Sequence, residues 1–133
     1  MITEDYVSFE TAKLLKEKGF DGECDYLYVN GDIIRAQGGK CNWNRGETLF
    51  TDYKNECSAP TLQMAMNWLL DTYKLHIVPT PYPHEDGEFY WAYKITFLDS
   101  DTLAVMVVKQ KAGFDSKENA CEGAIKYCLE NLI

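Results

Sequence analysis

Apolar residues recur along this chain with two periods, one close to 3.6 residues and one close to 2. The longer period predicts helices over 9–18, 61–73 and 116–131. The middle helix has the clearest apolar face, which consists of Leu62, Ala65, Met66, Leu69, Leu70 and Tyr73. The period of two, together with turn residues, predicts strands over 26–29, 33–36, 75–80, 88–98 and 102–109.

Residues at the ends of these segments predict where the helices begin and end. Ser8 is an expected N-cap, and Gly19 followed by Phe20 predicts a Schellman motif after the first helix. Ser58, with a proline two residues later, is the expected N-cap of the second helix. The third helix is expected to begin at Asp115 or Ser116.

The strand patterns also carry predictions about turns and burial. Asn30-Gly31 predicts a type I′ hairpin turn, because both central residues of that turn need positive φ. The strand over 75–80 is expected to end in the run Pro79-Thr80-Pro81-Tyr82-Pro83, because proline cannot continue a ladder. The alternating row of Phe89, Trp91, Tyr93, Ile95 and Phe97 is expected to be buried, and the apolar run 103–108 predicts a central strand or one covered on both faces.

These elements predict an α+β fold in one domain over residues 1–133. We expect one layer of three to five mostly antiparallel strands, with the helices over 61–73 and 116–131 packed on one face and the N-terminal helix beside them. Within that domain, 1–57 would hold the first helix, a hairpin and a long loop over 37–57, and 58–133 an α-β-β-β-α unit. Long loops are often functional, but Trp43 and Phe50 in this one could equally insert into the core.

The composition is acidic, with 21 Asp and Glu against 13 Lys and Arg and a formal net charge of −8. The acidic excess is spread evenly over both halves, so no basic segment is hidden. This balance argues against broad attraction to nucleic acid or anionic lipid. No apolar run is long enough to cross a membrane, and the N-terminus is not typical of a secretory signal. The sequence therefore predicts a cytoplasmic protein that does not bind membranes.

Residues that could carry chemistry form no recognisable motif. The five cysteines lack C-x-x-C spacing and are expected to be structural thiols. The two histidines, His76 and His84, lie in a strand and a turn and share no metal-site spacing. We expect no catalytic, cofactor or metal site, and hence a protein that is not an enzyme.

The second half resembles the double-stranded RNA-binding domain in its order of elements. Residues 116–120 (Ser-Lys-Glu-Asn-Ala), Ala124 and 129–132 (Leu-Glu-Asn-Leu) are similar to the last helix of that family. Of the three lysines that the family aims at phosphates, only Lys117 is matched, and the family's minor-groove loop corresponds to acidic residues over 83–87. The resemblance therefore implies a shared architecture without the family's RNA binding.

Most of the chain also resembles a second family, of small uncharacterised proteins encoded by gut Bacteroides species and their phages and mobile elements. The similar stretches are 6–20, 58–63 with Trp68-Leu69, and 124–129. This resemblance implies no activity.

Three functions remain open from the sequence. The first is a non-catalytic protein-binding or accessory module of a bacterial or phage system, whose partner and oligomeric state the sequence leaves open. Its candidate contacts are Trp43, Trp68 and Tyr90. The second is nucleic-acid binding through a local basic cluster. Its candidate phosphate contacts are Lys109, Lys111, Lys117 and Lys126. The third is an acidic mimic of nucleic acid.

Overall fold

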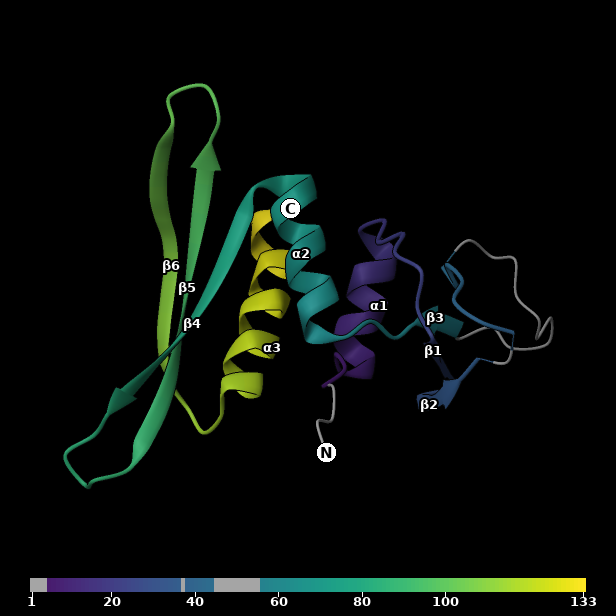
Figure 1. Ribbon diagram of the computed structural model, residues 1–133, viewed down its shortest axis with the longest axis horizontal. Helices are drawn as coiled ribbons and strands as arrows, with labels where there is room; N and C mark the ends of the chain where they lie inside the picture. The colour runs from purple at the N-terminus through teal and green to yellow at the C-terminus, as the bar shows by residue number, and fades with distance from the viewer. Residues whose placement is uncertain (1–4, 37, 45–55) are drawn as a thin grey trace. The chain divides into compact units, whose positions relative to one another are not determined.

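The computed structural model describes residues 5–36, 38–44 and 56–133 (Figure 1). The chain divides into two units, 1–65 and 66–133. The described part contains α-helices together with two antiparallel three-stranded sheets, so the predicted α+β class is confirmed. The expectation of a single layer of strands is wrong, because the strands form two separate sheets. The single domain over 1–133 stays a prediction.

The elements follow one another along the chain with these bounds: α1 Phe9–Glu17, β1 Tyr26–Val29, β2 Asp32–Arg35, β3 Glu56–Ser58, α2 Leu62–Tyr73, β4 Leu75–Pro83, β5 Phe89–Asp99, β6 Ala104–Phe114, α3 Lys117–Tyr127 and a π-helical turn Cys128–Leu132. In the part of the chain that is described, no helix is both long and apolar enough to span a membrane.

Local signals determine the ends of α1 as predicted. The Ser8 hydroxyl accepts a hydrogen bond from the Thr11 N–H. At the other end, Gly19 has φ +91°, and the N–H groups of Gly19 and Phe20 donate to the carbonyls of Lys16 and Leu15. These two bonds are those of a Schellman motif.

The first sheet has the order β2-β1-β3, with β1 in the centre. Asn30 and Gly31 both have positive φ, which confirms the predicted hairpin turn. Ser58 does not cap α2 as expected. It is paired with Leu27 in the sheet, and the Thr61 hydroxyl accepts from the Met64 N–H instead. Pairing of β3 with β1 thus moves the start of the helix beyond Pro60.

The second sheet has the order β4-β5-β6, and α3 packs against it (Figure 1). Ser116 caps α3 by accepting from the Asn119 N–H. The buried apolar residues of this unit lie on α2, on α3 with its terminal turn, and on β4 and β5: Leu69, Leu75, Ile77, Tyr93, Ile95, Ala120, Cys121, Ala124, Ile125, Cys128 and Leu129. The burial of Cys121 and Cys128 confirms that these thiols are core residues.

Two burial predictions for this sheet are wrong. The row on β5 is buried only at Tyr93 and Ile95, whereas Phe89 is 68 % and Phe97 37 % exposed. The strand over 103–108 is neither central nor covered, because β6 is an edge strand with an exposed apolar run. The two predictions fail for different reasons. The 11 residues of β5 span about 36 Å, whereas α3 with the five residues of its terminal turn spans only about 24 Å, so the ends of β5 extend beyond the helix. Val105 and Val107 stand opposite Leu98 and Thr96, on the face of the sheet that α3 does not cover.

The expected end of β4 is also wrong. Prolines at 79, 81 and 83 were expected to stop the ladder, but β4 pairs with β5 as far as Pro83. Proline is tolerated on an edge strand where its missing N–H would face away from the partner. Alternate residues of an antiparallel strand point their N–H groups to the same side, so these three prolines all lie on the outer side of the ladder.

Candidate functional site

The most unusual surface of the described chain is the N-terminal half of β6. Val105, Met106 and Val107 are 64 %, 56 % and 50 % exposed, and Leu103 precedes them with 86 % exposure. The run 103–108 contains no charged residue and no proline. Natural edge strands usually carry one of these to prevent pairing with other chains. The N-terminal half of β6 therefore lacks a charged or proline side chain at the edge, and the protection of this strand begins only at the register irregularity after Val107 and at Lys109.

The register shows which backbone groups of β6 lie at the free edge. The Leu98 N–H of β5 donates to Lys74 on the β4 side of the sheet. Its neighbours Phe97 and Asp99 therefore bond toward β6, opposite Met106 and Ala104. The N–H and C=O groups of Val105 and Val107, which lie between these residues, consequently point away from the sheet. The free edge presents backbone donors and acceptors beside valine side chains.

The opposite edge of the same sheet, formed by β4, is unsuited to pairing with another strand. In the C-terminal half of β4 the outward N–H groups would belong to residues 79, 81 and 83, and all three are prolines. A strand placed against this half of β4 would find carbonyl groups but no donors. The sheet thus has one edge that prolines block along its C-terminal half and one edge that is open to pairing.

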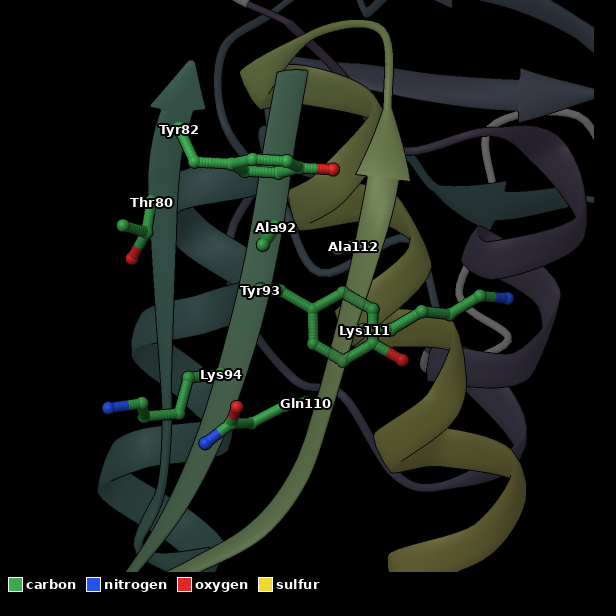
Figure 2. A pocket seen from close by; sticks show the side chains of 8 residues that line it. All are labelled: Thr80, Tyr82, Ala92, Tyr93, Lys94, Gln110, Lys111 and Ala112. Atoms are coloured by element: carbon green, nitrogen blue, oxygen red, sulfur yellow. The ribbon is translucent and has the colours of Figure 1, made fainter. Parts of the chain in front are cut away.

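The face of the sheet opposite α3 carries a hollow of about 550 Å³ (Figure 2). The ring of Tyr82 reaches across Ala92 toward β6, and its hydroxyl accepts from the Gly113 N–H at 2.9 Å. Lys94 and Gln110 stand opposite each other on β5 and β6 and line the hollow nearer its other end. The hollow is shallow, and most of its lining surface is apolar. Gln110, which lines it, follows Val107 by three residues on β6.

Tyr90, a predicted partner contact, lies on the same face of the sheet as this hollow, which we call the open face. It stands opposite Tyr82, close to the turn between β4 and β5. Its ring is 6.2 Å from that of Tyr82 and 5.0 Å from that of His84. Its hydroxyl donates to the Asp86 carboxylate at 3.2 Å. This hydrogen bond to Asp86, with the carboxylate charge, raises the pKa of Tyr90. The Tyr90 side chain is thus neutral, and its hydroxyl is a hydrogen-bonding group at this end of the open face.

The other two predicted contacts are placed differently. Trp43 is only 4 % exposed, its indole N–H donates to the Cys24 carbonyl at 2.9 Å, and its backbone N–H donates to the Ser58 hydroxyl. It belongs to the core, which is the alternative that the sequence left open, and it presents no surface to a partner. Trp68 is half-buried with its ring 5.4 Å from that of Tyr73. Phe50 lies outside the described residues.

The predicted basic cluster forms only in part. Lys111 and Lys126 line one small hollow of about 220 Å³, and Lys109 lies 5.1 Å from the ring of Tyr127 at its rim. Glu130 lines the same hollow. Lys117 lies in the first turn of α3 next to Glu118, nine residues before Lys126. Carboxylates thus interrupt the lysines on this surface.

The four buried thiols are not activated nucleophiles. Burial raises the pKa of Cys24 and Cys128 to about 12 and that of Cys57 to about 11, and it also raises the pKa of Cys121. All five cysteines are free, and only Cys41 is half-buried. Because the thiolate is the reactive form, this environment suppresses nucleophilic chemistry. In residues 5–36, 38–44 and 56–133, no three His, Cys, Asp or Glu side chains are grouped as metal ligands.

We expect iodoacetamide at pH 8 to alkylate Cys41 at least tenfold faster than the four buried thiols. A pKa of about 12 leaves about one thiol in ten thousand ionised at this pH. Peptide mass spectrometry over a time course measures each site, and the same protein in urea, where all five should react alike, is the control. Fast labelling of Cys24 or Cys128 in the folded protein would contradict the burial described above.

Comparison with known proteins gives no match to a family model, to a curated protein or to a solved structure. The resemblances found in the sequence therefore stay predictions.

The exposed valines of β6 were missed because an uncharged apolar run resembles a buried strand. The useful signal was the contrast between two strands. Prolines at every second position of one strand indicate an edge. In a three-stranded meander that begins at such a strand, the third strand is the other edge, and an unprotected apolar run there is a candidate interface.

Proposed function

We propose that this chain is a non-catalytic protein-binding module and that its partner binds as a β-strand added to the edge of β6. The observation that supports this most strongly is the pair of contrasting edges, one blocked by prolines and one apolar with free backbone groups. Strand addition uses such an edge, since the backbone supplies the hydrogen bonds and alternate side chains supply the specificity.

The side chains around the edge suit this mode of binding. Val105 and Val107 lie on the open face, because they stand opposite Leu98 and Thr96 of β5. Met106 lies on the other face, opposite Phe97. An added strand would therefore contact apolar side chains above and below the sheet. Large exposed apolar patches of this kind mark interaction sites in soluble proteins.

The alternative of nucleic-acid binding has weaker support. Lys111 and Lys126 come together, but Glu130 lies with them, Glu118 follows Lys117, and the net charge is −8. Phosphate binding needs clustered cations without competing carboxylates. An accessory role in a bacterial or phage system remains part of the proposal through the sequence resemblance alone.

Site-specific photo-crosslinking in the native host tests the proposal. A benzophenone amino acid at position 107 should yield a discrete adduct on irradiation, because a partner strand would lie within reach of the side chain. The same probe at Pro81 on the blocked edge is the matched control and should yield none. Absence of any adduct from positions 105 and 107 would contradict strand addition at β6.

A further inference from the structure

We infer that the strand added to β6 is β6 of a second copy of this chain. The two strands would run antiparallel about a two-fold axis and join two three-stranded sheets into one six-stranded sheet. This inference rests on the proposed function, because it names the partner at the same edge.

Backbone geometry defines the register of such a pair. The outward-pointing groups belong to Val105 and Val107, with Met106 between them. A two-fold axis at Met106 places Val105 of each copy opposite Val107 of the other, as a hydrogen-bonded pair. Met106 then stands opposite Met106 of the second copy as a non-hydrogen-bonded pair. Ala104 to Val108 each obtain a partner in this register, whereas Leu103, with φ +58°, lies in the turn before the strand.

The charges at the two ends of β6 favour self-pairing. Asp99 ends β5 and Asp101 lies in the turn before β6, whereas Lys109 and Lys111 lie in the second half of β6. The Asp99 carboxylate accepts from the N–H groups of Asp101 and Thr102, which lowers its pKa and keeps it ionised. Antiparallel pairing brings the basic half of each β6 toward the acidic turn of the other copy. A parallel arrangement would instead place like charges together.

The blocked edge explains why such an assembly would stop at two copies. A two-fold contact uses the same surface on both chains and is complete when formed. Further growth would need pairing at β4, where the prolines at 79, 81 and 83 remove the donors. Pairing at the β6 edge would thus produce a closed dimer instead of a fibre. A single strand pair is a small interface, so we expect reversible association.

Cysteine crosslinking tests the register. In an antiparallel non-hydrogen-bonded pair the Cβ atoms lie about 4.5–5.5 Å apart, close to the spacing that a disulfide needs. Met106→Cys should therefore form a disulfide-linked dimer under mild oxidation. Gln110→Cys is the control, since two copies of this position would be about 27 Å apart in the register. Crosslinking of the second variant but not the first would overturn the inference.

Sedimentation velocity tests the interface over a range of concentration. The wild type should shift from the 15.3 kDa monomer toward a species of twice that mass. Val107→Lys should weaken association about 100-fold or more, because it places a charge in the apolar centre of the contact. Thr80→Lys, on the open face of the blocked edge, is the matched control and should leave association unchanged.

Reversing the charges at Lys111 and Asp101 tests the interface in a way that distinguishes weaker association from a folding defect, because the double variant should restore the dimer. Lys111→Asp and Asp101→Lys should each weaken the dimer about tenfold at low salt, and the double variant should restore it. A dimer that persists in Val107→Lys, or a monomer at every concentration, would overturn the inference. If the purified chain is monomeric while the probe at 107 captures a different protein, the proposed function stands and the inference fails. If the probe captures nothing, both fail.

Discussion

Replacing Ile95 by alanine should lower the free energy of unfolding of the unit 66–133 by about 3–4 kcal/mol. Ile95 is fully buried on β5 beneath α3, and the substitution removes apolar contacts and leaves a cavity. Urea denaturation followed by circular dichroism measures this loss. An effect of this size is a large part of the stability of an ordinary small protein, so the variant would unfold at much lower urea.

Val105→Ala is the matched control for this substitution. Val105 lies in the neighbouring strand in an equally apolar stretch of sequence, yet its side chain is largely exposed. Little apolar contact is lost, so the change in the free energy of unfolding should stay below about 1 kcal/mol at low protein concentration. Similar losses at both positions would show that β6 is buried, and this would contradict the edge on which the proposed interface depends.

Trp43→Ala should lower the free energy of unfolding of the unit 1–65 by about 3–5 kcal/mol. The indole is buried, and its N–H donates to the carbonyl of Cys24, so the substitution removes both packing and a hydrogen bond. Thermal denaturation measures the stability, and acrylamide quenching of tryptophan fluorescence measures the exposure.

Trp68→Ala is the control for Trp43, because Trp68 is half-buried. Its replacement should lower the free energy of unfolding by less than half as much. The double variant Trp68→Ala, Trp91→Phe leaves Trp43 as the one tryptophan of the sequence, and its fluorescence should be poorly quenched. A tolerated Trp43→Ala, with strong quenching of Trp43 in this double variant, would return Trp43 to the list of partner contacts.

Local features of this protein were accessible from its sequence. The cap at Ser8, the Schellman motif at Gly19 and the turn at Asn30-Gly31 were predicted as the structure has them. Each depends on hydrogen bonds and φ angles within a few residues, so neighbouring side chains determine it. The predicted helix start at Ser58 and the predicted strand end at the prolines of 79–83 were wrong, because strand pairing, which joins distant segments, decided these boundaries.

The candidate site was less accessible. The sequence proposed three aromatic contacts, and of these Tyr90 lies on the open face of the sheet, while Trp43 is in the core. An aromatic side chain is equally suited to a core and to an interface, so residue type alone did not separate the two. Lysines predicted as a cluster lie partly together, but Glu130 among them could be found only in three dimensions.

The α+β class and the order of helices and strands, apart from β3, follow from hydrophobic periods and turn residues that lie within each segment. β3 lies at the end of the predicted loop over 37–57 and was missed, because its pairing with β1 joins distant segments. Which apolar run is covered was decided by the tertiary structure. Because α3 covers only one face of the sheet, Ile95 on that face is buried, whereas Val105 and Val107 on the opposite face of an edge strand remain exposed. Burial is a property of what packs against a strand, and the strand's own residues do not contain that information.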